Sequence, residues 1–103
     1  MGFIADFVRR KEIDEFARAL AAQVLRRLPV ESLKDQKKVH SEIEIALGHA
    51  QGFQRKARLG TFGKSRLVNT FQWALIESGY GPEIAKDIGH RIASRIAPPT
   101  PQR

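Results

Sequence analysis

The sequence predicts an all-α protein: a compact bundle or orthogonal array of four main helices with a short N-terminal helical extension. Apolar residues recur at helical spacing through most of the 103 residues, and glycine and proline stand where helices would begin and end. No stretch shows the alternation of apolar and polar residues that is typical of a half-buried strand. The length suits a single domain over residues 1–97, followed by an extended proline-rich tail at 98–103.

The first helical stretch covers residues 3–28 and contains two apolar stripes. At about 100° per residue these stripes point roughly 120° apart, so a bend is expected between them, near residues 9–12. Residues 1–10 could then form a separate short helix that docks on the domain, on a partner or on a membrane surface. Pro29 is expected to end the main helix. The two stripes are Phe3, Ile4, Phe7 and Val8, and Ile13, Phe16, Ala17, Leu20, Ala21, Val24 and Leu28.

The next helix is expected to begin at Ser32, which forms an approximate capping box with Asp35. It should end just before Gly60, which would serve as a left-handed cap. Gly48 and Gly52 lie one turn apart and predict close approach to a neighbouring helix. The expected core face is Val39, Ile43, Ala46, Leu47, Ala50, Phe53 and Ala57.

Residues 61–64 are expected to form a loop, and residues 65–78 a third helix that Gly79 ends. Pro82 suits the first position of the last helix, since its missing N–H would be unpaired there in any case. The expected inner faces of these two helices are Leu67, Val68, Phe71, Ala74 and Leu75, and then Ile84, Ala85, Ile88, Ile92, Ala93 and Ile96. Trp73 lies to one side and fits either a core edge or an exposed contact.

The charge balance points to a polyanion partner. Eighteen Lys and Arg face eleven Asp and Glu, which gives a net charge of +7. The window between Ile45 and Ile76 contains no acidic residue, and its cations predict either an anion-binding face or an ordinary solvated surface. These cations are Arg55, Lys56, Arg58, Lys64 and Arg66.

Several function classes lack the residues they need. The chain has no cysteine, so it has no disulfide and no thiolate metal site, which fits a cytoplasmic location. His40, His49 and His90 do not have the spacing of a metal site, and no serine lies in a nucleophile elbow. No apolar run approaches the roughly 20 residues that cross a bilayer. The expectation is therefore a protein that is not an enzyme and needs no cofactor, metal or small-molecule substrate.

Residues 60–65 contain the Gly-Lys-Ser ending of a nucleotide-binding P-loop. Arg58 stands where the first glycine of that motif should be, and no strand precedes the loop, so nucleotide hydrolysis is excluded. The same loop resembles the GxxG loop of the KH RNA-binding fold, which requires a sheet that this sequence does not predict. The feature that remains from this pattern is a second helix N-terminus, which lies beside basic residues.

Residues 75–88 form the most structured local pattern in the chain. Gly79, Tyr80, Gly81 and Pro82, with an alanine and an isoleucine at helical spacing behind them, resemble the helix-hairpin-helix motif of DNA-binding proteins. That resemblance implies binding of the DNA backbone without sequence recognition, with amides at the start of the second helix facing a phosphate. The same residues also fit a plain turn between two helices.

The leading hypothesis is a small basic protein that contacts the backbone of DNA, in preference to RNA. A single surface is expected to bring together the turn and the cations, and its predicted contact residues are Arg55, Lys56, Arg58, Lys64, Arg66, Gly79, Gly81, Arg91 and Arg95. The alternative is a helical protein-protein interaction module, such as a regulatory or assembly subunit. Weak membrane-surface contact through the apolar N-terminus is a third hypothesis.

Overall fold

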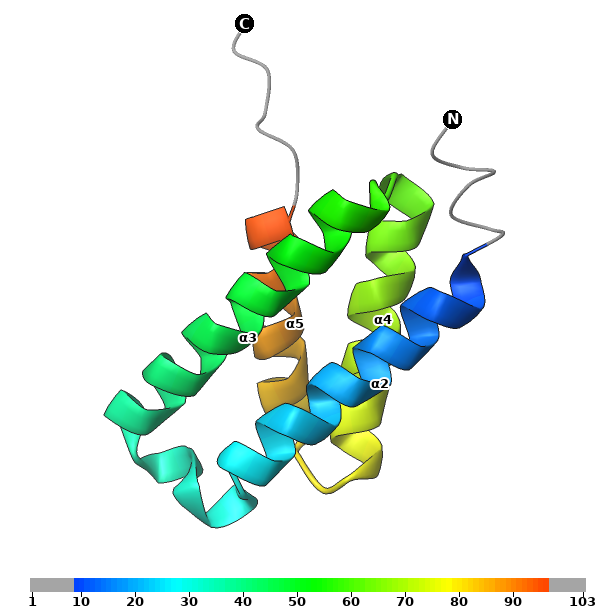
Figure 1. The fold of residues 1–103 in the computed structure, drawn as a ribbon. Coiled ribbons are helices and arrows are strands. Elements are labelled where there is room, and N and C mark those ends of the chain that lie inside the picture. Colours follow the sequence, from blue (N-terminus) through cyan, green and yellow to red (C-terminus); the bar gives the residue numbers. More distant parts are fainter. Residues whose placement is uncertain (1–8, 97–103) are drawn as a thin grey trace, which may run out of the picture.

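A computed structural model describes residues 9–96 and is entirely helical in architecture within that range (Figure 1). The predicted all-α fold with four main helices is confirmed. The expectations for most of residues 1–10 and for the tail at 98–103 lie outside the described residues. The helices are α2 (Arg10–Arg27), the 3-10 helix η1 (Val30–Lys34), α3 (Gln36–Ala57), α4 (Thr61–Glu77) and α5 (Pro82–Ile96).

Helix α4 packs against both α2 and α5. Helix α2 packs most extensively on α4, α4 pairs with α5, and α3 closes against α5 and α2. In Figure 1 the start of α2, the α3–α4 junction and the end of α5 lie toward one end of the molecule, whereas η1 and the α4–α5 turn lie at the other. Helix α4 runs between these ends, and its 17 residues span about 25 Å.

The core is built from the apolar stripes that the sequence predicts, because each helix buries one face against its neighbours. Between α2 and α3, the rings of Phe16 and Phe53 stack with centroids 4.1 Å apart. Ile84 departs from its predicted stripe and is 40% exposed. The largest fully buried side chains are Phe71, Ile13, Leu28, Ile43, Leu67, Leu75, Ile92 and Ile96.

The start of α3 differs from the prediction. The predicted cap, Ser32, lies inside η1, and Asp35 caps α3 instead by accepting a hydrogen bond from the backbone N–H of Lys38 at 3.2 Å. In the predicted capping box, Ser32 was the cap and Asp35 was the third residue of the helix. An aspartate in an extended conformation before the first helical residue can satisfy an unpaired N–H itself, so the helix begins three residues later.

The α3–α4 junction also differs from the prediction. Arg58, not Gly60, takes the left-handed conformation, with φ 55° and ψ 52°. Gly60 is extended and immediately precedes α4, so the predicted loop at residues 61–64 is the first turn of that helix. Because Leu59 is buried beneath the junction, the chain reverses within three residues and leaves no room for a longer loop.

The α4–α5 turn has the predicted form. Gly79 adopts φ 116°, and its N–H bonds the Ile76 carbonyl at 3.1 Å. The N–H of Tyr80 bonds the Leu75 carbonyl at 3.1 Å, which completes a Schellman motif. Pro82 is the first residue of α5, as its fixed φ favours.

The close approach predicted at Gly48 and Gly52 is wrong. Both glycines are exposed, and a side chain at either position would meet nothing within 4 Å. The close approach occurs instead at Gly89, which is buried and where a Cβ would fall 2.5 Å from Cγ of Gln72. Gly89 therefore sets how near α5 lies to α4.

Candidate nucleic-acid interface

Cations from three separate parts of the chain gather where α2 begins, α3 ends and α4 begins. The Arg9 guanidinium donates a hydrogen bond to the Ala57 carbonyl, which fixes the start of α2 beside the end of α3. Lys64 lies in the first turns of α4, directly after the junction. We call this surface the basic end; it consists of Arg9, Arg10, Lys11, Arg55, Lys56, Arg58 and Lys64.

The basic end is positive for local reasons as well. Among residues 9–96, no carboxylate pairs with Arg55, Lys56, Arg58 or Lys64. Helix α4 begins with no acidic residue in its first turn and no side-chain cap, so the positive end of its dipole adds to the cations. Glu12 is the acidic exception, and it lines a small hollow with Arg9 and Lys56.

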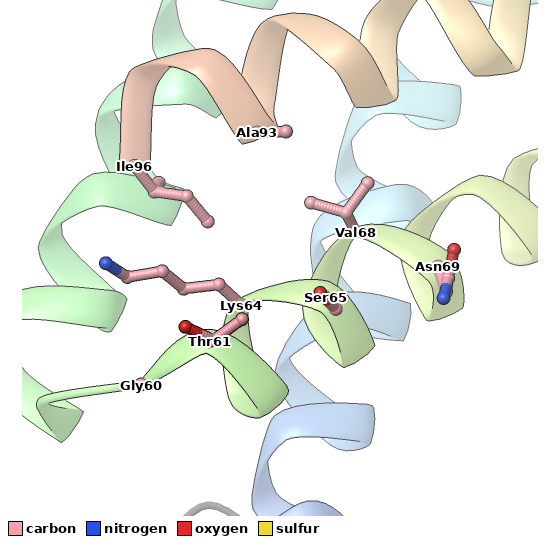
Figure 2. A pocket seen from close by; sticks show the side chains of 8 residues that line it. All are labelled: Gly60, Thr61, Lys64, Ser65, Val68, Asn69, Ala93 and Ile96. Carbon is pink, nitrogen blue, oxygen red and sulfur yellow. The ribbon is translucent and has the colours of Figure 1, made fainter. Parts of the chain in front are cut away.

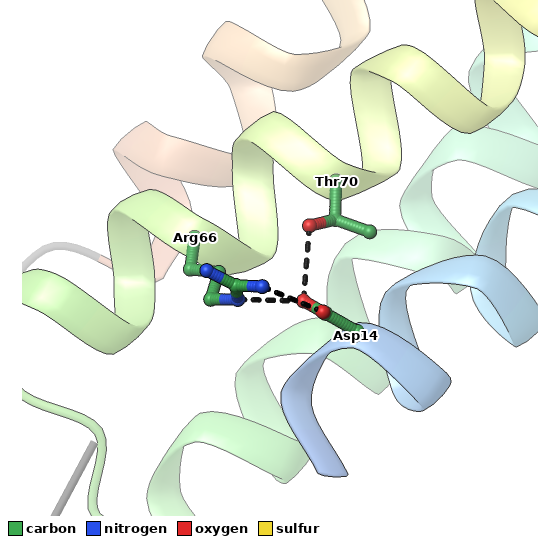
Figure 3. Close-up of polar contacts among 3 residues, drawn as sticks. All are labelled: Asp14, Arg66 and Thr70. Atoms are coloured by element: carbon green, nitrogen blue, oxygen red, sulfur yellow. Dashed lines mark hydrogen bonds and ion pairs between the residues drawn. The ribbon is translucent and has the colours of Figure 1, made fainter. Parts of the chain in front are cut away.

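Arg66 is not part of the basic end, because it is bound to α2. Its Nε and Nη2 donate to the two carboxylate oxygens of Asp14, each at 2.8 Å, and Thr70 donates to the same carboxylate at 3.2 Å (Figure 3). The hydrogen bond from Arg66 lowers the pKa of Asp14 below its ordinary value. A paired, two-pronged contact of this kind joins α2 to α4.

Arg91 and Arg95 also have carboxylate partners. Arg91 lies 3.4 Å from Asp87, one turn earlier on α5, and Arg95 lies 3.2 Å from Glu44 on α3. Both pairs are partly exposed, so each is a weak restraint. These arginines nevertheless carry their own counter-charge, unlike Arg55 and Lys56.

The α4–α5 turn lies at the end of α4 remote from the basic end. Gly79 and Gly81 are exposed, but Tyr80 between them is buried, and its hydroxyl donates to the Leu28 carbonyl at 2.6 Å. Burial raises the pKa of this phenol above its ordinary value. Glu77 and Glu83 flank the turn.

The single contact surface expected from the sequence is therefore divided. Arg55, Lys56, Arg58 and Lys64 come together, whereas Gly79 and Gly81 lie about the length of α4 away from them. The arginines at positions 66, 91 and 95 are engaged with carboxylates. Sequence reasoning also left Arg9, Arg10 and Lys11 out of the predicted contact surface. They lie at the start of α2, and only the packing of the helices brings them near the end of α3.

The structure contains a groove that the sequence did not indicate. It has a volume of about 560 Å³ and lies between the first half of α4 and the last turn of α5 (Figure 2). Val68, Ala93 and Ile96 supply apolar walls, and Lys64 and Asn69 are among the polar residues at its edge. All three were expected to face the core; Ile96 does, since it is 2% exposed, and Val68 is partly buried against it.

The three histidines are all exposed and lie apart on α3 and α5. Within the described range there is no group of three His, Asp or Glu side chains that could hold a metal ion. No helix between residues 9 and 96 is both long enough and apolar enough to cross a membrane.

No family model, no curated protein and no solved structure matches this chain. The interface is consequently defined by geometry and charge alone.

Proposed function

We propose that this protein binds the phosphate backbone of DNA, without recognising a base sequence, and that the basic end is its contact surface. The observation that supports the proposal is the meeting of cations from α2, α3 and α4 at one end, where four of them have no carboxylate partner among the described residues. The proposal keeps the cytoplasmic location expected from the sequence.

Phosphate binding of this kind depends on releasing the counterions that surround DNA, so affinity falls steeply as salt rises. Each phosphate contact contributes about 0.9 to the slope of log affinity against log salt. A cation that already has a carboxylate partner gains less from contact with a phosphate, because an intramolecular ion pair must be broken first. This argument removes Arg66, Arg91 and Arg95 from the proposed interface.

The test compares two matched variants in a titration of a short DNA duplex at several salt concentrations. One replaces Arg55, Lys56 and Arg58 by Gln at the end of α3. The control replaces Lys34, Lys37 and Lys38 by Gln, which are exposed and lie in η1 and at the start of α3, remote from the basic end. Both variants lose three positive charges.

In the first variant we expect the dependence of log affinity on log salt concentration to become shallower by about 2–3. In the control it should stay nearly unchanged. Circular dichroism checks that both remain helical. Equal loss in both variants would show that only net charge matters, and retention of binding in both would refute the basic end as the contact surface.

A helical protein-interaction module is the second candidate, because Trp73 is 62% exposed. It borders a shallow hollow on the α2–α4 seam that Phe62 and Arg18 also line. Exposed tryptophans dominate many protein interfaces. This candidate predicts association with a protein that resists salt, is lost on Trp73→Ala and survives the triple glutamine substitution at the end of α3.

A further inference from the structure

Trp73 is a large apolar side chain that α4 leaves in contact with solvent. It is 62% exposed and lines a shallow hollow of about 410 Å³ on the seam between α2 and α4. Core packing does not account for it, because the buried face of the same helix is formed by residues such as Leu67, Phe71 and Leu75. The indole therefore offers an accessible aromatic surface on a rigid helix.

The hollow beside Trp73 is balanced in charge. Arg66, on its edge, is bound to Asp14, and Arg18 lies 3.9 Å from Glu77, which also lines the hollow. Two arginines and two carboxylates therefore offset one another there, in contrast to the basic end. Surfaces that bind single strands combine cations for the backbone with aromatic side chains for the bases. A neutral hollow with an aromatic edge suits a base, whereas phosphate favours the basic end.

Helix α4 connects the basic end to this hollow. Ser65 and Asn69 lie in successive turns of α4 (Figure 2), and Trp73 follows one turn later. All three are exposed and line the hollow, and the two polar side chains can form hydrogen bonds without adding charge. The helix has no acidic residue before Glu77. From Lys64 to Trp73 it rises about 14 Å, which is about four nucleotides of a stacked strand.

We propose that Trp73 stacks on an unpaired base of DNA whose backbone is held at the basic end, so that the protein prefers a duplex with a single-stranded overhang. This inference rests on the proposed DNA contact at the basic end. Bases inside a duplex are stacked on their neighbours and offer no free face to the indole. Stacking on an aromatic side chain accepts any base, which agrees with binding that recognises no base sequence.

The test uses the fluorescence of Trp73, which is the only tryptophan in the chain. Two DNA duplexes are titrated at low salt while tryptophan emission is followed. One has a single-stranded overhang of about six thymidines, enough to cover the distance along α4. The control has an overhang of the same length made of abasic nucleotides. Both overhangs carry the same phosphates, so a difference between them reports contact with the bases.

Stacking predicts that the thymidine overhang quenches the emission of Trp73, whereas the abasic overhang does not. It also predicts that the DNA with thymidines binds at least about five-fold more tightly. In a second titration, with labelled DNA, Trp73→Ala should remove this preference and leave the affinity for the abasic DNA unchanged. Trp73→Phe should keep most of the preference, because phenylalanine still offers an aromatic face.

The outcomes separate this inference from the proposed function. Equal affinity for the two DNAs, with binding that still weakens when Arg55, Lys56 and Arg58 are replaced by Gln, would overturn the inference alone. No binding of either DNA would overturn both. Emission that changes when the protein is concentrated without DNA, and that does not differ between the two DNAs, would assign Trp73 to contact with a second protein chain and overturn the inference.

Discussion

Arg58 and Gly79 end helices α3 and α4 with the same pair of backbone hydrogen bonds. The N–H of Arg58 bonds the Arg55 carbonyl at 3.3 Å, and the next N–H, of Leu59, bonds the Gln54 carbonyl at 3.1 Å. Gly79 and the residue after it repeat this pattern on α4. A left-handed conformation costs little at glycine and about 1–2 kcal/mol at other residues, so α3 ends with a strained arginine.

Replacing Arg58 by Gly is therefore expected to raise the free energy of unfolding by about 1 kcal/mol, because it relieves that strain. Gly79→Ala is the converse change and should lower the free energy of unfolding by a similar amount. Urea unfolding followed by circular dichroism measures both. A loss of stability in Arg58→Gly would mean that the arginine side chain contributes more than its backbone strain costs.

Tyr80 ties the α4–α5 turn to the end of α2 by donating its hydroxyl proton to the Leu28 carbonyl. Phe at this position would leave that carbonyl unpaired in the core. We expect Tyr80→Phe to lower the free energy of unfolding by about 1–2 kcal/mol at neutral pH, as measured by urea unfolding.

The same residue predicts a dependence on alkaline pH. Burial raises the pKa of Tyr80 above the value of 10.0 that applies when the chain is unfolded, so the unfolded chain releases this proton more readily. The contribution to stability is complete below pH 10 and is lost as the pH rises through the raised pKa. Comparing wild type with Tyr80→Phe between pH 8 and 11 isolates it, and the difference between them should shrink above about pH 10.

At the scale of the helices, glycine has opposite roles in α3 and α5. A Cβ at Gly89 would overlap inner atoms of the Gln72 side chain, at 2.5 Å from Cγ and 2.6 Å from Cδ. At Gly48, on the exposed face of α3, a Cβ would meet nothing within 4 Å. The α4–α5 spacing therefore depends on Gly89, whereas Gly48 only weakens the helix that contains it.

We expect Gly89→Ala to lower the free energy of unfolding by about 1–3 kcal/mol through overpacking. Gly48→Ala should raise it by up to about 1 kcal/mol, because alanine favours the helix more than glycine does. Thermal unfolding of the two variants provides the comparison. If both changes stabilised the protein, Gln72 would have moved aside at little cost.

At the scale of the whole molecule, the position of α4 separates the two features that suggest a polyanion partner. The basic end lies at its start and the glycine-bounded turn lies beyond its end, about 25 Å away. The two surfaces can accordingly be tested one at a time.

Gly81→Ala distinguishes them. The position is exposed and a Cβ there meets nothing within 4 Å, so the fold should be unchanged. If the basic end is the contact surface, DNA affinity should remain within about two-fold of wild type, a difference of about 0.4 kcal/mol. A larger loss in the duplex titration would show that the turn approaches phosphate closely, as the helix-hairpin-helix resemblance implies.

The sequence by itself determined the helices, their inner faces and the α4–α5 turn. Helical periodicity, Pro29, Gly79 and Pro82 act within a few residues, so their effect is visible in the chain order. Local signals failed at the start of α3, where Ser32 and Asp35 compete as caps, and at the α3–α4 junction, where Arg58 rather than Gly60 ends the helix.

Only the tertiary structure decided which charges share a surface. The partners of Arg66 and Arg95 lie about fifty positions away along the chain, at Asp14 and Glu44, and no spacing rule connects them. The groove between α4 and α5 likewise arises from how two helices cross. Helix packing sets which side chains meet, because contacts between distant segments depend on the arrangement of whole elements rather than on neighbouring residues.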